Sequence, residues 1–254
     1  MLSAQQIINY QAQDNLLKNR IILVTGAGDG IGKAAAMAFA EAGAELVLAG
    51  RTVAKLEQVY DQIIAAGGVE PCIYPIDLEG ATKQDYKQLA ISCDQQFGRL
   101  DGLLLNAGIL GQRTPLSSYR QDVWDKVLKV NLSAQFQMTQ ALMPILEKSD
   151  SSSVIFTSSG VGRVGRAFWG AYAVSKFAIE GLVQTWAAEL EGLNSVRINC
   201  INPGATSTQM RAQAFPAENP NSIASPEDII PAYLYLMGAD SQTVNGKSID
   251  AQIK

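Results

Sequence analysis

Tyr172 and Lys176 are the two side chains whose types and spacing best suit acid–base chemistry. They are four residues apart in a stretch where residues 172, 176, 179, 183, 186 and 190 fall on one face of a helix. A phenol has a pKa of about 10, and an adjacent ammonium stabilises the phenolate and brings this pKa toward neutrality. We therefore predict proton transfer at Tyr172, although a Tyr-Lys pair alone is also common on exposed helix surfaces.

A glycine-rich turn earlier in the chain supports a catalytic role for this Tyr-Lys pair. Residues 25–32 read TGAGDGIG and lie between an apolar stretch typical of a strand and an alanine-rich stretch typical of a helix. Glycines let the backbone approach a pyrophosphate, and the amides at the start of a helix donate hydrogen bonds to it. We predict a dinucleotide site here, and not merely a tight turn, formed by Gly26, Gly28, Asp29, Gly30, Ile31 and Gly32.

The end of the second expected strand indicates which dinucleotide binds. NAD sites carry an Asp or Glu near this place, but here the chain reads Leu48-Ala49-Gly50-Arg51. The Arg51 guanidinium can meet a 2′-phosphate with forked, charge-assisted hydrogen bonds, which favours NADP over NAD. A solvated surface arginine is the alternative, and the acid Asp29 beside the phosphate would weaken the preference.

The composition restricts the chemistry further. The 254 residues include no histidine, which excludes Ser-His-Asp and Cys-His nucleophiles and histidine metal sites. Cys72, Cys93 and Cys200 are too widely spaced for a metal cluster or a disulfide framework, so we expect no metal and a reducing, cytoplasmic setting. A net charge of -4 offers no basic patch for nucleic acid. We also expect no signal peptide and no contact with a membrane.

Short aliphatic runs alternate with longer amphipathic stretches, which is typical of a parallel sheet wrapped by helices. We expect strands at residues 21–25, 45–49, 71–76, 101–105, 153–158, 196–201 and 247–250, and helices at 31–42, 53–66, 82–97, 121–146, 171–190 and 226–236. The prediction is an α/β fold, a single-domain Rossmann-type doubly wound fold with a seven-stranded parallel sheet flanked by helices.

Two segments do not fit this alternation. Residues 1–20 are expected to be a loosely attached helical lead-in, and residues 21–254 to form a single NAD(P)-binding catalytic domain. Residues 205–225 are a long polar segment after the sixth strand, at the edge where open parallel sheets bind ligands. We expect this segment to form a mobile lid over the substrate.

Together these motifs resemble the short-chain dehydrogenase/reductase family, from about residue 21 to residue 250. The turn at 25–32 matches its TGxxxGxG motif, residues 172–176 match its YxxxK motif, and Ser159, 13 residues before Tyr172, matches its catalytic serine. The other matches are Asp77 with Leu78, Asn106-Ala107-Gly108, Asn131, and Pro203 and Gly204 with Thr208. Residues 50–51, 156–159 and 214–216 are similar to the bacterial YciK-type oxidoreductases within the family.

The resemblance implies an NADP-dependent oxidoreductase that moves hydride between nicotinamide C4 and a small carbonyl or alcohol substrate. Tyr172 would exchange the proton, Ser159 would hold the substrate oxygen, and Lys176 would bind the nicotinamide ribose and lower the pKa of Tyr172. Asn131 would order a water that relays the proton, while Asp77, Leu78, residues 106–108, Pro203, Gly204 and Thr208 would contact the cofactor. A non-catalytic, NADP-binding redox sensor is the alternative, which the intact catalytic residues disfavour.

The resemblance also bears on assembly. Family members pair through two long helices, here residues 121–146 and 171–190, so a homodimer or homotetramer is expected. The sequence Asp250-Ala251-Gln252 departs from the DGG-like sequence that is usual in the family at this place.

The segment between Ser159 and Tyr172 must border the substrate if both ends are catalytic. Its apolar residues Val161, Phe168 and Trp169 are candidates for the pocket wall. Arg166 would meet a polar or acidic group of the substrate. The alternative is that Arg163 and Arg166 are solvated, or pair with acids across a subunit contact, and that the aromatic rings only pack.

Overall fold

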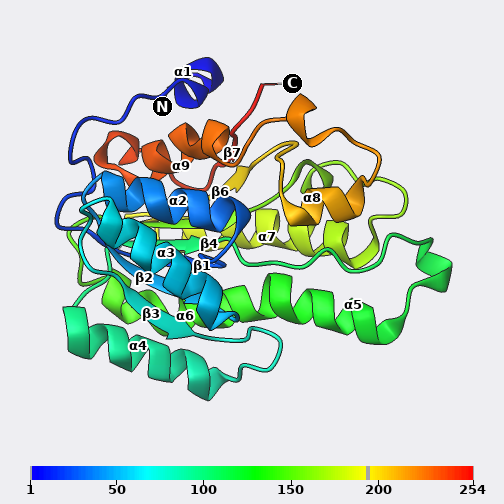
Figure 1. The fold of residues 1–254 in the computed structure, drawn as a ribbon. Helices are drawn as coiled ribbons and strands as arrows, with labels where there is room; N and C mark the ends of the chain where they lie inside the picture. Colours follow the sequence, from blue (N-terminus) through cyan, green and yellow to red (C-terminus); the bar gives the residue numbers. More distant parts are fainter. Residues whose placement is uncertain (1, 193–194, 254) are drawn as a thin grey trace.

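The computed structural model describes residues 2–192 and 195–253. Within these residues, seven parallel strands form one sheet in the order β3-β2-β1-β4-β5-β6-β7 (Figure 1). The strands are β1 (Ile21–Thr25), β2 (Glu45–Gly50), β3 (Cys72–Pro75), β4 (Gly102–Leu105), β5 (Ser152–Thr157), β6 (Val196–Asn202) and β7 (Ser248–Asp250). This is the predicted doubly wound sheet, whose order reverses between β1 and β4.

Helices cover both faces of the sheet (Figure 1). They are α1 (Ala4–Ile8), α2 (Gly30–Glu41), α3 (Val53–Ala65), α4 (Lys83–Phe97), α5 (Gln121–Leu128), α6 (Ala134–Leu146), α7 (Gly170–Glu189), α8 (Gln209–Ala214) and α9 (Ile230–Met237). Short 3-10 turns lie at Leu116–Ser118, Gly160–Gly162, Pro220–Ser222, Glu227–Ile229 and Ala239–Ser241. No helix in the described ranges is both long enough and apolar enough to cross a membrane.

The strands are apolar on both sides because each side meets a layer of helices. In β1, Ile22 and Val24 pack into the core formed with α2, α3 and α9. Leu23, between them, packs into the other core, with α4, α6 and α7. Consecutive side chains of a strand point to opposite faces, so burial on both faces produces the continuous aliphatic runs seen in the sequence.

The helix predicted at residues 121–146 is interrupted. A π-helical turn at Lys129–Ser133 joins α5 to α6. Asn131 lies in this turn and is fully buried, and its side chain exchanges two hydrogen bonds with the backbone of Ile109, at 2.8 and 2.9 Å. Such turns often occur at functional sites. Here the turn brings the helix and the loop after β4 together.

The segment at residues 205–225 is more ordered than the loop we predicted. It contains α8, which Thr208 caps by accepting a hydrogen bond from the backbone of Arg211 at 3.2 Å. Thr206 and Ala224 form a β-bridge that closes the base of the segment. The last predicted helix also differs, because a 3-10 turn occupies residues 227–229 and α9 begins only at residue 230.

The prediction that the lead-in is loosely attached is wrong. Ile7 and Leu17 are 2% and 0% exposed. The ring of Tyr10 packs edge-on against Tyr235 of α9, with 5.4 Å between centroids, and its hydroxyl donates to Asp240 at 2.7 Å. The polar residues between these anchors conceal the attachment in the sequence. Figure 1 shows α1 lying over α9 on the outside of the fold.

Candidate active site

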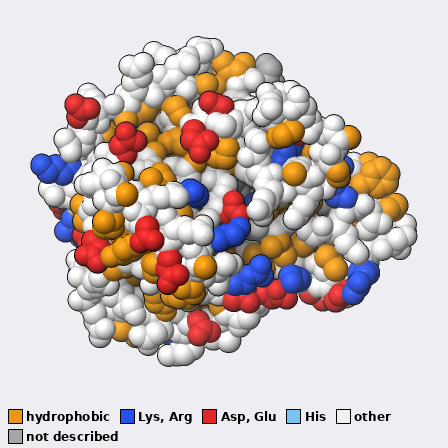
Figure 2. Space-filling model, in the orientation of Figure 1, with side chains coloured by type: hydrophobic (Ala, Val, Ile, Leu, Met, Phe, Trp, Pro, Cys, Tyr) orange, Lys and Arg blue, Asp and Glu red, His pale blue; other side chains and the backbone are white. Residues whose placement is uncertain are grey.

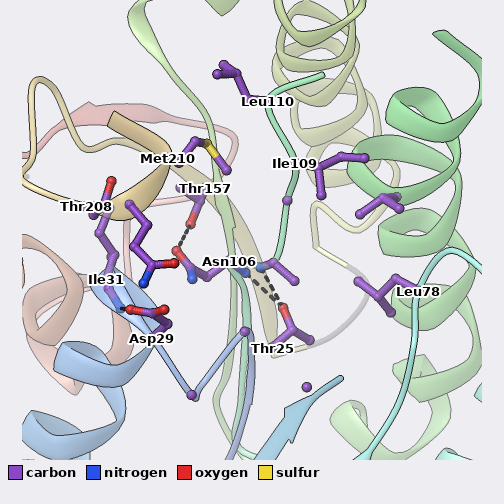
Figure 3. Close-up of a pocket in the computed structure, with 18 of the residues that line it drawn as sticks. Thr25, Asp29, Ile31, Leu78, Asn106, Ile109, Leu110, Thr157, Thr208 and Met210 are labelled. Carbon is purple, nitrogen blue, oxygen red and sulfur yellow. Dashed lines mark hydrogen bonds between the residues drawn. The ribbon is translucent and has the colours of Figure 1, made fainter. Parts of the chain in front are cut away.

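A cavity of about 530 Å³ opens at the carboxyl ends of the central strands, where the strand order reverses. Side chains from the ends of several strands converge on it (Figure 3). It is lined by most of the predicted site residues: Gly26, Gly28, Asp29, Gly30, Ile31, Arg51, Asp77, Leu78, Asn106, Ala107, Gly108, Ser159, Tyr172, Lys176, Pro203, Gly204 and Thr208. Two predicted residues, Gly32 and Asn131, are buried behind this lining. The structure thus brings the predicted cofactor and catalytic residues into one cavity.

The glycine turn has its shape because two of its positions admit no side chain. Gly26 has a φ of +67°, in the left-handed region. A Cβ on Gly32 would lie 2.2 Å from the carbonyl oxygen of Gly26 and 2.7 Å from Nδ2 of Asn106. The turn can therefore bring the start of α2 close against β1. The amides at the start of this helix consequently lie at the cavity, as an anion site requires.

Asp29, whose charge weighed against NADP, is neutralised by a neighbour. Its carboxylate caps α2 by accepting from the backbone of Gly30 at 2.7 Å, and its other oxygen pairs with the ammonium of Lys55. The Lys55 ammonium lowers the pKa of this carboxyl group below its usual value. Sequence reasoning missed Lys55, although a basic residue in the first turn of the helix after β2 was a usable signal.

Arg51 lies at the same end of the cavity as Lys55. It is exposed, and within the described part of the chain its guanidinium has no hydrogen-bond or ion-pair partner. Figure 2 shows basic side chains beside the hollow on this face of the molecule. An unpartnered guanidinium, beside an Asp29 carboxylate whose charge Lys55 balances, is a suitable environment for a phosphate.

Thr25 joins the ends of the two strands on either side of the switch point. Its hydroxyl oxygen accepts from the backbone amides of Asn106 at 3.0 Å and Ala107 at 3.1 Å (Figure 3). The same hydroxyl donates to the carbonyl of Leu104 at 3.2 Å. Thr157 at the end of β5 adds a bond to the side chain of Asn106 at 3.3 Å. The floor of the cavity is therefore fixed by side chains as well as by the sheet.

The catalytic candidates come from β5 and α7. Ser159 follows β5, and Tyr172 and Lys176 lie one turn apart near the start of α7. Tyr172 is 8% exposed and Lys176 is 3% exposed. The Lys176 ammonium donates to the carbonyl of Thr157 at 2.6 Å and lies 5.6 Å from the centroid of the Tyr172 ring. The three side chains face one cavity, as their sequence spacing predicts.

The expected lowering of the pKa of Tyr172 is not found. Burial raises the pKa of this phenol, and the nearby Ser159 hydroxyl offsets only part of the increase. The reason is geometric, since the Lys176 ammonium is directed at the Thr157 carbonyl and lies over the ring face. Burial also lowers the pKa of Lys176, to about 8.

The buried ammonium of Lys176 should make stability depend on pH. Between about pH 8 and the ordinary lysine pKa of 10.5, the unfolded chain holds a proton that the folded chain has lost, so the free energy of unfolding rises with pH. Relative to Lys176→Met, the cofactor-free protein should gain up to about 3 kcal/mol between pH 7.5 and 10.5. Urea unfolding of both proteins as a function of pH measures this difference. If the free energies of unfolding of the two proteins changed in parallel with pH, the pKa of Lys176 would not be lowered by burial.

Asn131 connects the catalytic helix to the loop after β4. Besides its bonds to Ile109, its Nδ2 donates to the hydroxyl of Ser175 at 3.2 Å, and this hydroxyl donates to the carbonyl of Tyr172 at 2.7 Å. A Cβ on Gly108 would lie 3.3 Å from Asn131 and 3.9 Å from the Lys176 ammonium, so these groups meet around one glycine. The side chain of Asn131 thus holds the backbone around the site.

The other end of the cavity is apolar. Leu110, Trp169, Met210 and Ala214 line it next to Tyr172, and the Trp169 and Tyr172 rings are 5.6 Å apart. Trp169 was one of the wall residues that we expected from the sequence. Leu110 was missed, and Met210 and Ala214 were covered only by the predicted lid at residues 205–225, because the sequence did not indicate which of its side chains face the cavity.

The other expectations for the segment between Ser159 and Tyr172 need correction. Arg166 is exposed and does not line the cavity, and Phe168 is 53% exposed. Val161 is buried beneath the cavity wall. Arg163 pairs within the same chain, with Asp250 at 2.7 Å and with Glu180 at 3.4 Å. Two other arginines reach this region. Arg113 stacks on the rings of Trp169 and Phe215 at 4.6 and 4.8 Å, and Arg211, which lines the cavity, stacks on Phe215 at 3.8 Å.

Known proteins resemble this chain along nearly its whole length. The family model for short chain dehydrogenases matches residues 20–219. The oxidoreductase YciK of Escherichia coli (strain K12) is 50% identical over 245 residues, which cover 96% of each chain. A short chain dehydrogenase from Pseudomonas syringae has a TM-score of 0.94 at 57% identity, over 96% of this chain and 98% of that one.

A further solved structure, a short chain dehydrogenase from Escherichia coli CFT073, is a complex with NADPH. Its TM-score is 0.92 at 51% identity, over 95% of this chain and 100% of that one. These matches confirm the resemblance that the motifs suggested, including the similarity to the YciK-type oxidoreductases. Sequence, fold and site geometry agree: the chain is an oxidoreductase that belongs to the short-chain dehydrogenase/reductase family.

Proposed function

We propose that this chain is an NADP-dependent oxidoreductase that interconverts a carbonyl group and an alcohol on a small molecule. The observation that carries the proposal is that Ser159, Tyr172 and Lys176 line the same cavity as the glycine turn. A phosphate-binding turn and a phenol proton donor in one cavity suit a reaction that moves a hydride and a proton together.

The residues at the cavity fit a 2′-phosphorylated dinucleotide. Gly26 is in the left-handed region and position 32 has no room for a side chain, so the turn packs tightly and its backbone amides at the start of α2 can bind the pyrophosphate. Arg51 offers an unpaired cation for the 2′-phosphate, while Lys55 compensates the charge of Asp29 beside it. The NADPH complex of the similar Escherichia coli CFT073 protein supports this choice over NAD.

The other residues predicted to contact the cofactor would bind different parts of it. Asp77 and Leu78 would meet the adenine, and Asn106, Ala107 and Gly108 the middle of the cofactor. Pro203, Gly204 and Thr208 would border the nicotinamide. When bound, the cofactor supplies or accepts the hydride.

The chain's own side chains would handle the oxygen and the proton. Tyr172 would donate its hydroxyl proton to the carbonyl oxygen, or accept it from an alcohol in the reverse direction. Ser159 would hold that oxygen, since a hydroxyl both donates and accepts hydrogen bonds. Lys176 would bind the nicotinamide ribose hydroxyls, and a water beside Asn131 would replace the proton on Tyr172.

We further propose that residues 21–254 act as one catalytic domain and that residues 205–225 serve as its lid. The lid would contribute Met210 and Ala214 to the apolar end of the cavity, which favours a substrate with an apolar body. Three free thiols, Cys72, Cys93 and Cys200, are compatible with the proposed cytoplasmic setting.

A homodimer or homotetramer is the expected assembly. Val174 and Phe177 on α7 are 42% and 45% exposed, and Phe136 on α6 is 37% exposed. Light scattering at micromolar concentration should give two or four times the 27.2 kDa mass of one chain. Phe177→Asp should shift this mass toward one chain, and Val69→Asp, an exposed position on the segment before β3, should not. A single-chain mass for the unmodified protein would contradict the assembly.

The test of the proposed function is NADPH oxidation followed by absorbance in the presence of a panel of aldehydes and ketones. We expect turnover with at least one apolar carbonyl compound, a clear preference for NADPH over NADH, and the reverse reaction with the matching alcohol. Tight binding of NADP without turnover of any panel member or alcohol would instead support the redox sensor.

A further inference from the structure

Gln252 follows β7 and reaches across to the loop after β6. Its Nε2 donates to the carbonyl of Pro203 at 2.7 Å, to the carbonyl of Ala205 at 3.0 Å and to the hydroxyl oxygen of Thr206 at 3.3 Å. All three partners act as acceptors from one amide group. Residues 203–206 are therefore gathered around the end of a single side chain.

The loop is shaped to receive this side chain. Gly204 has a φ of +74°, and a Cβ there would lie 2.9 Å from Nε2 of Gln252 and 3.0 Å from its Cδ. Asn202, just before the loop, is held by the same part of the chain: its Nδ2 donates to Asp250 at 2.7 Å, and its carbonyl accepts from the backbone of Ala251 at 3.0 Å. The glycine that is usual at this place in the family has no side chain, so it would donate none of the three hydrogen bonds that Gln252 makes.

The same loop has two roles at the cavity. Pro203, Gly204 and Thr206 line it on the side that we assign to the nicotinamide. Thr206 also forms the bridge to Ala224, and Ser207 donates its amide to the carbonyl of Ala224 at 2.8 Å, so the base of the proposed lid begins here. A contact that holds residues 203–206 in place therefore holds both one wall of the proposed cofactor site and the base of the proposed lid.

We propose that Gln252 is a positioning residue that holds residues 203–206 in the conformation required by the nicotinamide half of the cofactor. The proposal rests on the proposed function. Gln252 makes no contact with Arg51, Lys55 or Asp77 among its hydrogen bonds within the described residues, so the adenosine half of the site should not depend on it.

Two ligands separate the halves of the site. Adenosine 2′,5′-bisphosphate carries the adenine and the 2′-phosphate but no nicotinamide, whereas NADP carries all of them. Calorimetric titration of Gln252→Met, which keeps the length but loses the donor, should show NADP binding about tenfold weaker. Gln252→Glu, which directs a carboxylate at three acceptors, should weaken it further. Both variants should bind the bisphosphate within about twofold of the unmodified protein.

Ile253→Ala is the matched control, because the neighbouring Ile253 is 56% exposed and should leave both affinities unchanged. Hydrogen exchange of the cofactor-free proteins gives a second readout: amides of residues 204–207 should exchange faster in Gln252→Met, and those of residues 26–32 should not.

Equal weakening of both ligands, or unchanged NADP affinity with unchanged exchange, would overturn the positioning role. Failure of the unmodified protein to bind NADP would overturn the proposed function itself, so the two failures are distinct. If Gln252→Glu does not fold, Gln252→Met alone still decides between the outcomes, because it adds no charge.

Discussion

Tyr172→Phe should turn over carbonyl substrates about 100 to 10,000 times more slowly than the unmodified enzyme, the range expected for loss of a general acid. The substitution keeps the aromatic ring, which packs 5.6 Å from Trp169 and closes the apolar end of the cavity. It removes only the hydroxyl, which we assign as the proton donor to the substrate oxygen. The loss should appear in kcat, measured by NADPH oxidation at saturating substrate.

Cofactor binding provides the control for this experiment. Affinity for NADP should be preserved in Tyr172→Phe, since the turn at residues 26–32 and Arg51 are untouched. Tyr60→Phe is a matched variant on α3. The hydroxyl of Tyr60 donates to Glu70 at 2.6 Å and does not line the cavity, so its removal should leave turnover unchanged. Turnover by Tyr172→Phe at the unmodified rate would place the proton donor elsewhere.

Arg51→Ala should remove most of the preference for NADP over NAD. Hydrogen bonds to charged groups contribute about 1.5–3 kcal/mol, so affinity for NADP should fall about tenfold to a hundredfold, while affinity for NAD stays nearly constant. The guanidinium has no partner to lose among the described residues, so the substitution should not disturb the fold. Calorimetric titration with both cofactors measures the change.

Arg166→Ala serves as the control for charge alone, because Arg166 is an exposed arginine that does not line the cavity. It should leave the ratio of the two affinities unaltered. Equal affinities for NADP and NAD in the unmodified protein would refute the role of Arg51, and a residual preference in Arg51→Ala would be assigned to Lys55.

Local patterns were sufficient to predict the sheet and to identify side chains that share one cavity. The aliphatic runs marked the strands because both faces of the sheet are buried, and the spacing of Tyr172 and Lys176 placed them one helical turn apart. Gly26 and Gly32 marked two positions of the turn where no side chain fits. Each of these features is set by neighbours in the sequence.

Features that depend on distant partners escaped prediction. Lys55 acquires its role by pairing with Asp29, 26 positions earlier. The lead-in looked detachable because Ile7 and Leu17 find their packing partners on other helices. Arg166 was favoured for its closeness to Tyr172 along the chain, whereas Arg113 reaches the aromatic cluster from the loop after β4.

The π-helical turn at Lys129–Ser133 also limits how the length of this segment can change. A π-helical turn holds one residue more than an α-helical stretch of the same rotation, so converting it to regular α-helix without removing a residue would rotate α6 by about 100° relative to α5. Met138 and Leu142, both 0% exposed, would leave the core as Asn131 was withdrawn from Ile109. A regular helix would therefore keep Met138 and Leu142 in the core only if it were one residue shorter, and it would then lose the turn that holds Asn131 against Ile109.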